Sequence, residues 1–338
     1  MTMSKPPVLD QPIQGGSLLA ALDSLLADDL AAVERILWNE LESDQPCVKD
    51  ILQHATRFRG KRLRPILVLL SARACGEVNE THRLLAAVVE MIHIATLVHD
   101  DVLDEASTRR HVATVNARWN NETSVLFGDY LFTHAFHLAS ELPTSHACRI
   151  IGRATNKVCE GELTQIHERG NLDLNEETYF KIINGKTAEL TAVSAYLGAH
   201  YADQPAEVVN AVEAYGRKLG LAFQIADDLL DILGVEKKTG KTLGSDLKKQ
   251  KLTLPIIRLL ATATSADATI IRELLAHPED DTAGQLREYL HKSDALEYTS
   301  QTAHKLVEEA CEHLNVLPES QARHWLCEIA RFSVERSF

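Results

Sequence analysis

The chain has 338 residues, of which 45% are hydrophobic, and a formal net charge of −13 at pH 7. These apolar residues suffice for a large core, and the acidic balance argues against binding to nucleic acid or to an anionic membrane, since phosphate-rich partners require a basic surface. The six cysteines form no CxxC pair. They indicate reduced thiols in a cytoplasmic protein rather than a disulfide framework or a zinc site.

The elements expected along the chain are almost all helices. Residues 1–16 contain three prolines and no apolar segment, which predicts a flexible tail rather than a signal peptide. From residue 17 onward the periodicity is helical, and the prolines fall between the periodic segments. We expect about ten to thirteen helices, no sheet, and one all-α domain over residues 17–338, a helical bundle around a deep central cavity. Neither GxGxxG nor GxxxxGK[ST] occurs, so those nucleotide-binding loops are excluded.

The first notable segment, Gly60–Pro65, is basic and contains Lys61, Arg62 and Arg64. Lys61 and Arg64 are three residues apart and can point in one direction on a helix. Such a cluster alone is ordinary solvated charge, but guanidinium and ammonium groups also bind phosphate oxygens. Its function therefore depends on what lies beside it.

A strongly apolar segment, Leu84–Leu103, follows, and it ends in the acidic motif Asp100-Asp101-Val102-Leu103-Asp104. Glu90, His93 and His99 interrupt it, which predicts a buried core helix rather than a membrane span. Asp100 and Asp104 share a helix face. His93 lies two turns before Asp100 on that face, so it is either a satisfied core residue or a phosphate donor.

The middle of the chain adds weaker signals. Arg109-Arg110 follows the acidic motif closely enough to reach the same cavity. His134 and His137 share a face without a carboxylate or thiol partner, so we expect no metal site there. Asn175 predicts the start of a helix, and Lys186-Thr187 lies between two helical stretches.

The acidic motif then recurs as Asp227-Asp228-Leu229-Leu230-Asp231, again after an apolar segment. Gln224 lies one turn earlier on the same face, and a lysine-rich segment with Lys241 and Lys251 follows. One copy alone could be a solvated helix end. Two copies on apolar helices repel and lose solvation unless cations lie between them, and carboxylate oxygens suit Mg²⁺ carried with a phosphate substrate. We expect three Mg²⁺ ions with a bound diphosphate, with all six aspartates as candidate ligands: Asp100, Asp101, Asp104, Asp227, Asp228 and Asp231.

These motifs resemble those of the trans-isoprenyl diphosphate synthases, the polyprenyl synthetase family, and especially its long-chain branch. The likeness extends from about Leu41 to Phe338 and is carried by Gly60–Pro65, Ile92–Asp104, Gly185–Ala188, Phe223–Asp231, Gly240–Asp246 and Lys251–Pro255. It implies the all-α isoprenoid synthase fold, a homodimer, and condensation of isopentenyl diphosphate with an allylic diphosphate. Two departures are Arg59 in place of glycine before Gly60-Lys61, and His111-Val112-Ala113 in place of Gly-x-Pro after Arg109-Arg110.

The resemblance also implies the roles of individual residues. Isopentenyl diphosphate would be held by Lys61, Arg64, His93 and Arg110, and the allylic diphosphate by Arg109, Lys186, Thr187, Gln224 and Lys241, with Lys251 close by. Asp100, Asp104, Asp227 and Lys186 would carry catalysis. The allylic diphosphate would ionise, the double bond of isopentenyl diphosphate would attack the cation, and the released diphosphate would take the proton.

Product length is expected to depend on the helix before Asp100. One helical turn of about 5.4 Å is close to one isoprene unit, and small Ala95 would let a growing chain pass towards Met91, Ile92 and Val88. We expect about six to nine units on this ruler. Two alternatives are a class I terpene cyclase, disfavoured by the second Asp-Asp-x-x-Asp and by few aromatics, and a non-catalytic subunit, disfavoured because both motifs are complete.

Overall fold

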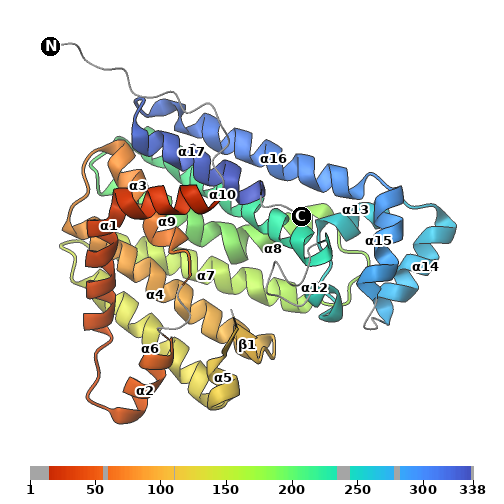
Figure 1. Cartoon of the computed structure of the whole chain (residues 1–338), viewed down its shortest axis with the longest axis horizontal. Coiled ribbons are helices and arrows are strands. Elements are labelled where there is room, and N and C mark those ends of the chain that lie inside the picture. Colours follow the sequence, from red (N-terminus) through yellow and green to blue (C-terminus); the bar gives the residue numbers. More distant parts are fainter. Residues whose placement is uncertain (1–14, 56–59, 110, 234–243, 278–281, 336–338) are drawn as a thin grey trace.

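The computed structural model of the chain describes residues 15–55, 60–109, 111–233, 244–277 and 282–335, which are almost entirely helical (Figure 1). The expected all-α fold is confirmed, with sixteen α-helices in these ranges rather than ten to thirteen. The helices are α1 (Gly15–Glu40), α2 (Pro46–Ala55), α3 (Leu63–Cys75), α4 (Glu80–Leu103), α5 (Val115–Arg118), α6 (Asn121–Ser140), α7 (His146–His167), α8 (Glu176–Ile183), α9 (Glu189–His200), α10 (Ala206–Leu233), α12 (Ser245–Lys248), α13 (Leu254–Thr262), α14 (Ser265–Ala276), α15 (Thr282–Lys292), α16 (Ala295–His313) and α17 (Gln321–Val334). A π-helical segment, η2 (Asn184–Ala188), joins α8 to α9, and a 3-10 turn, η3 (Leu314–Val316), follows α16.

The expectation of no sheet was wrong in one place. Strands β1 (Thr108–Arg109) and β2 (Val112–Ala113) pair antiparallel just after the first acidic motif. His111, between them, adopts a left-handed backbone with φ of 64°, and Thr114 donates a hydrogen bond of 2.7 Å to the carbonyl of Ala106. Two residues per strand are too few to produce the alternation by which a strand is recognised in sequence.

Helix α4 lies in the core and carries the first acidic motif at its end. It begins in a capping box, in which the Asn79 side chain accepts from the His82 backbone and the His82 ring accepts from the Asn79 backbone. It packs against α1, α3 and α6. By length and composition it is the one described helix that could cross a membrane. Because most of its apolar residues are buried within the bundle, it has the packing expected of a core helix.

Helix α10 carries the second acidic motif and lies among α9, α16 and α17. The hydroxyl of Tyr215 donates a hydrogen bond of 2.7 Å to the backbone carbonyl of Leu326, so a fully buried contact joins α10 to α17. In Figure 1, α16 and α17 lie together along one side while α13, α14 and α15 gather at one end. Helix α3 packs on both α4 and α9, and α9 packs on α10, so α3 and α9 connect the helices that carry the two acidic motifs.

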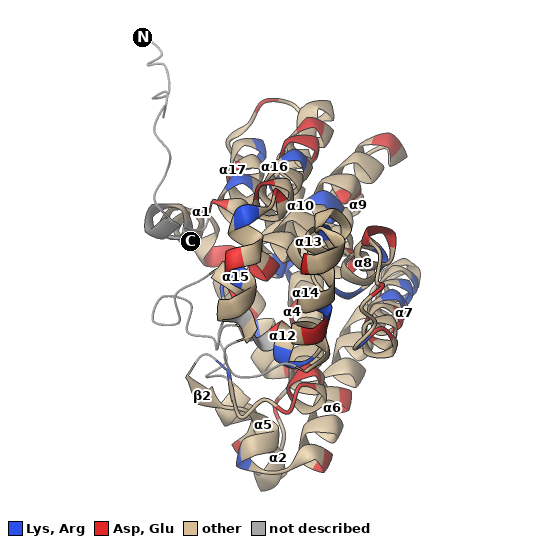
Figure 2. Ribbon diagram, turned by 90° about the vertical axis from the view of Figure 1, so that its right-hand side faces the viewer, with Lys and Arg blue, Asp and Glu red and all other residues tan. Residues whose placement is uncertain are grey.

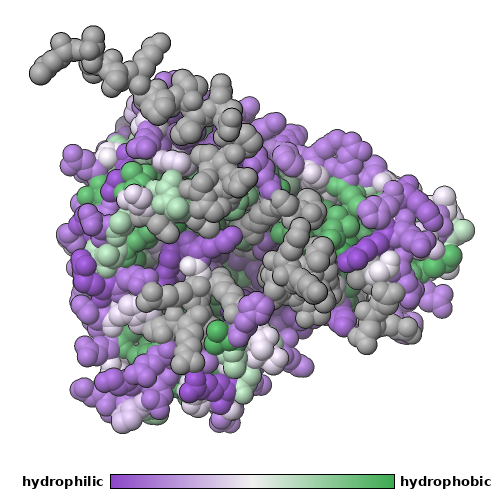
Figure 3. Space-filling view, in the orientation of Figure 1, coloured by the Kyte–Doolittle hydropathy of each residue, from purple (hydrophilic) through white to green (hydrophobic). Residues whose placement is uncertain are grey.

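Hydrophilic side chains cover much of the described surface on the face in Figure 3, and the hydrophobic areas between them are broken up. The expected tail over residues 1–16 lies almost wholly outside the described residues, and α1 begins at Gly15. The limits of the domain therefore stay a prediction.

Candidate active site

The first acidic motif ends α4. Asp104 is the residue after the last helical one, and its backbone N–H donates to the carbonyl of Asp100 at 2.8 Å. Burial raises the pKa of Asp100 to about 6; Lys186 opposes the rise, whereas Glu162 and Asp104 add to it. The positive charge near Asp100 therefore does not offset the cost of burying its ionised carboxylate.

The second aspartate of this motif, Asp101, has other partners. It is 3% exposed, and Arg109 donates to its two carboxylate oxygens from Nε and Nη2 at 2.8 to 3.1 Å. This bidentate pair connects the end of α4 to strand β1. Arg109, expected to hold the allylic diphosphate, is thus bound to Asp101 in this structure, and both residues' expected roles stay predictions.

Asp104 is surrounded by cations from the segment after α12 and from the segment after α7. Lys251 and Lys249 each place Nζ 3.1 Å from one of its carboxylate oxygens, and Arg169 lies 3.8 Å away. Burial would raise the pKa of Asp104, but the two lysines hold it below its ordinary value. Figure 2 shows basic and acidic residues close together near α12 and α4. Lys249 was not foreseen, because nothing in the lysine-rich segment distinguishes it from its neighbours.

In the second acidic motif, as in the first, the second aspartate is buried and bound by other side chains. Asp228 is 3% exposed and accepts hydrogen bonds from the Tyr179 hydroxyl at 2.6 Å and from Gln224 Nε2 at 2.8 Å. Burial and Asp246 raise the pKa of Asp228 well above its usual range. Asp231 accepts the backbone N–H of Asp246 at 3.2 Å, while Asp227 is half-buried on α10.

The π-helical segment η2 lies between the two motifs. Lys186 pairs with Glu162 of α7, and the charges of Asp100 and Glu162 raise its pKa although burial alone would lower it. On the other side, Thr187 donates a hydrogen bond of 2.8 Å to Gln224 Oε1, and Gln224 in turn reaches Asp228. Segment η2 thus lies beside Asp100 of the first acidic motif and, through Gln224, beside Asp228 of the second.

Two glycines allow this arrangement. A Cβ atom on Gly161 would lie 2.5 Å from the backbone nitrogen of Lys186, and one on Gly185 would lie 2.8 Å from the carbonyl oxygen of Lys157. The backbones of α7 and η2 can therefore approach closely, which places Glu162 beside Lys186. Glu162 and Tyr179 were missed from sequence, since their relevance depends on this approach and on the packing of α8 against α10.

The expected isopentenyl diphosphate residues lie at the start of α3 and on α4. Lys61 is exposed, with Nζ 5.6 Å from the centre of the Phe332 ring. Arg64 has its Nε buried without a hydrogen-bond partner among the described residues, and burial lowers the pKa of Arg64 to about 10. His93 is half-buried on α4. Arg110 and Lys241 lie outside the described residues.

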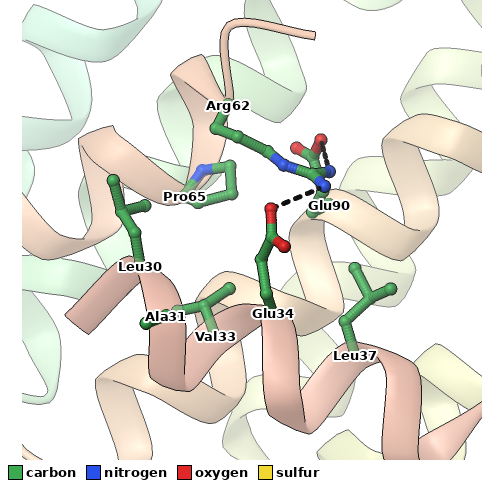
Figure 4. Close-up of a pocket in the computed structure, with 8 residues that line it drawn as sticks. All are labelled: Leu30, Ala31, Val33, Glu34, Leu37, Arg62, Pro65 and Glu90. Carbon is green, nitrogen blue, oxygen red and sulfur yellow. Dashed lines mark hydrogen bonds and ion pairs between the residues drawn. The ribbon is translucent and has the colours of Figure 1, made fainter. Parts of the chain in front are cut away.

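The expected chain-length residues, Val88, Met91, Ile92 and Ala95, are all fully buried on α4. A cavity of about 190 Å³ lies between α1, α3 and α4, lined by Arg62, Glu34 and Glu90 together with apolar side chains (Figure 4). The deep cavity expected beyond Asp100 stays a prediction. The expectation that no carboxylate accompanies His134 and His137 was wrong, because His134 Nδ1 lies 2.8 Å from Glu40 Oε1 of α1.

The carboxylates suit a hard divalent cation. The half-buried Asp100 has a raised pKa because the charge of Lys186 does not offset its burial, so its carboxylate is an oxygen donor that a cation would stabilise. Within the described residues, no three His, Cys, Asp or Glu side chains form a ready-made metal site. Asp100 and Asp104 lie at the end of α4 and Glu162 lies on α7, an arrangement that fits an ion shared with a phosphate ligand.

Comparisons with known proteins show the family to which the chain belongs. The polyprenyl synthetase family model matches residues 45–292. The chain is 36% identical over 312 residues to all-trans-nonaprenyl-diphosphate synthase (geranyl-diphosphate specific) of Rhodobacter capsulatus, covering 92% of this chain and 96% of that protein. It is 34% identical over 319 residues to octaprenyl diphosphate synthase of Escherichia coli K12, covering 94% and 99%.

Solved structures are also similar. The crystal structure of a polyprenyl synthase from Caulobacter crescentus CB15, complexed with calcium and isoprenyl diphosphate, superposes with a TM-score of 0.89. It is 35% identical in sequence, and the match covers 94% of this chain and 98% of that one. With a family model over most of its length and relatives matched almost end to end, this chain belongs to the polyprenyl synthetase family of prenyltransferases.

Proposed function

We propose that this chain condenses isopentenyl diphosphate with an allylic diphosphate and releases a long-chain all-trans polyprenyl diphosphate. The observation that carries the proposal is the meeting of both acidic motifs with the cationic and hydroxyl groups of η2. Asp100 approaches Lys186 on one side, and Gln224 joins Thr187 to Asp228 on the other. Family membership and the names of the two relatives support the chemistry and a long product.

The divalent metal would be Mg²⁺, three ions being expected with the diphosphate. Asp100, Asp104 and Asp227 are the proposed ligands. When bound, Mg²⁺ supplies positive charge that stabilises the departing diphosphate. Asp101 and Asp228 already hold strong partners, so they would contribute only after exchanging those partners. Asp231 receives the N–H of Asp246 and would bind a metal through its remaining lone pairs.

The chain's own residues would bind the substrates and stabilise charge. Lys186, Thr187 and Gln224, with Arg109 and Lys241, would hold the allylic diphosphate and lower the energy of the transition state as its C–O bond breaks. Lys61, Arg64 and His93, with Arg110, would orient isopentenyl diphosphate so that its double bond attacks the allylic cation. The apolar side chains of α4 would exclude water, which would otherwise quench that cation. The released diphosphate would accept the proton.

Product length would follow from α4. Ala95 has a small side chain, Met91, Ile92 and Val88 lie further from Asp100 along α4, and all four are fully buried. A chain of about six to nine units is therefore proposed, at one helical turn per isoprene unit. We also propose a cytoplasmic homodimer. Large hydrophobic side chains remain exposed on α6 and α7, at Val125, Leu126 and Leu163, and their burial between two subunits would be favourable.

Product analysis by mass spectrometry tests the proposal. The purified chain would be incubated with isopentenyl diphosphate, farnesyl diphosphate and Mg²⁺, with an EDTA control. A metal-dependent ladder ending at one long linear diphosphate would support it. Cyclised hydrocarbons would indicate a terpene cyclase instead, and no turnover with any allylic primer would indicate a subunit that needs a partner.

A further inference from the structure

We propose that Arg62 is a positioning residue whose guanidinium, held by Glu34 and Glu90, fixes the segment that presents Lys61 and Arg64 to isopentenyl diphosphate. The inference rests on the proposed function, which gives Lys61, Arg64 and His93 the task of binding that substrate. Arg62 itself would not touch the substrate.

The three side chains meet between helices far apart in sequence. Arg62 Nη1 donates to Glu90 Oε1 of α4 at 2.8 Å, and Nη2 donates to Glu34 Oε1 of α1 at 3.2 Å. Figure 4 shows the two carboxylates on either side of the guanidinium. The Arg62 side chain is 15% exposed and that of Glu90 is 5% exposed. Charge-assisted hydrogen bonds at such burial are strong and directional.

The backbone conformation of Arg62 explains how this contact could affect the neighbouring residues Lys61 and Arg64. Arg62 has φ of 52° and ψ of 32°, the left-handed conformation, at the residue immediately before α3. A residue with a Cβ atom disfavours that conformation unless its surroundings hold it there. Lys61 precedes this point and Arg64 lies in the first turn after it. Release of the guanidinium would therefore let the backbone relax and change the direction of Lys61 relative to Arg64.

Glu90 connects the same contact to the other expected substrate residues. Its charge raises the pKa of Arg64 against the larger lowering by burial, so the carboxylate lies near Arg64 as well as Arg62. Glu90 is also three residues before His93 on α4, on the same helix face. One buried carboxylate thus bonds to Arg62, acts on Arg64 through its charge, and lies one helical turn before His93.

The cavity of about 190 Å³ beside the guanidinium makes a sharp test feasible. Leu30, Val33, Leu37 and Pro65 form its apolar wall, and the two carboxylates lie at its polar end. Replacing Arg62 with alanine would enlarge this space and leave Glu34 and Glu90 without their shared cation. A small guanidinium compound could then take the place of the lost side chain.

The experiment compares Arg62→Ala with Arg73→Ala in the full chain. Arg73 is a matched control, because it also bonds to a carboxylate of α1, Asp29 at 2.7 Å, but lies near the C-terminal end of α3, whereas Arg62 immediately precedes that helix. We expect Arg62→Ala to raise KM for isopentenyl diphosphate about tenfold or more, with kcat and KM for the allylic diphosphate within about twofold. Methylguanidinium at about 50 mM, far below denaturing concentration, should lower that KM again, whereas Arg73→Ala should show neither effect.

An equal rise in KM for both substrates, or no rise in either, would overturn the proposal, as would a selective rise that methylguanidinium leaves unchanged. If Arg62→Ala does not fold, Arg62→Lys keeps the charge without the two-pronged geometry, and the same selective rise in KM is required of it. Isopentenyl diphosphate binding measured by calorimetry gives a readout independent of turnover. An unaltered wild-type chain that makes no product would instead refute the proposed function, and calorimetry would still decide the role of Arg62.

Discussion

The charge on Asp100 should destabilise the metal-free protein at neutral pH, and its removal should stabilise the fold. Burial, only partly offset by Lys186, raises the pKa of Asp100 from 3.8 to about 6. A tenfold change in an acid dissociation constant corresponds to about 1.4 kcal/mol, so ionising this group in the folded state costs up to about 3 kcal/mol. Asp100→Asn should therefore raise the free energy of unfolding by about 1–3 kcal/mol at pH 7.5, or the Tm by about 2–6 °C.

The sign follows from proton binding. Between about pH 4 and pH 6 the folded protein holds a proton on Asp100 that the unfolded chain has lost, so the contribution of Asp100 to the stability of the wild type falls as pH rises through this window. The difference between Asp100→Asn and the wild type should be absent below pH 4 and complete above pH 6. Urea unfolding in EDTA at several pH values measures it.

Asp104→Asn is the internal control, because it should act in the opposite direction. Lys251 and Lys249 keep the pKa of Asp104 below its ordinary value, so its charge favours folding and its loss should lower the Tm at pH 7.5. The reasoning is refuted if Asp100→Asn destabilises the metal-free protein, or if the two variants change stability in the same direction. With Mg²⁺ and diphosphate added, the wild type should gain more stability than Asp100→Asn, since only it keeps that ligand.

Three further changes test other parts of the structure. Ala95→Phe should shorten the product, because the added ring lies on the path proposed along α4; an unchanged product in mass spectrometry would contradict that path. Gly161→Ala should destabilise the fold by about 1–3 kcal/mol, since its Cβ would lie 2.5 Å from the backbone nitrogen of Lys186. The same change should weaken allylic diphosphate binding in calorimetry, and a wild-type affinity would show that α7 and η2 can separate freely. Tyr215→Phe should cost about 1–3 kcal/mol in urea unfolding, because the buried carbonyl of Leu326 loses its donor, while KM values stay unchanged.

Local patterns in the sequence predicted much of this structure. Asn175 was expected to start a helix, and its side chain does accept the N–H of Thr178 at 2.9 Å at the start of α8. The segment before Asp100 was expected to be a core helix, and α4 is one. These features depend on neighbours within a few residues, so they are visible without knowledge of the fold.

Features that depend on contacts between distant segments were not predictable in the same way. The sequence placed Lys186 and Thr187 between two helices, but it did not predict the π-helical turn that carries them or the close approach of α7 to that turn. Arg62 belonged to a basic cluster in sequence, and only folding shows that it faces two glutamates rather than a ligand. Likewise, Lys249 became a partner of Asp104 through the path of the chain after α12.

The repeated acidic pentapeptide shows why the pattern alone could not assign roles within each copy. Helical spacing places the first and last aspartates on one face, and the middle one about 100° away. In both copies that middle residue is 3% exposed and bound to the surrounding fold: Asp101 to Arg109 of β1, and Asp228 to Tyr179 of α8 and to Gln224. The same position thus anchors a neighbouring element in each half of the molecule. Anchoring of this kind would hold the outer aspartates in place for a metal, which would account for three acidic residues in a motif where only two are proposed to face the substrate.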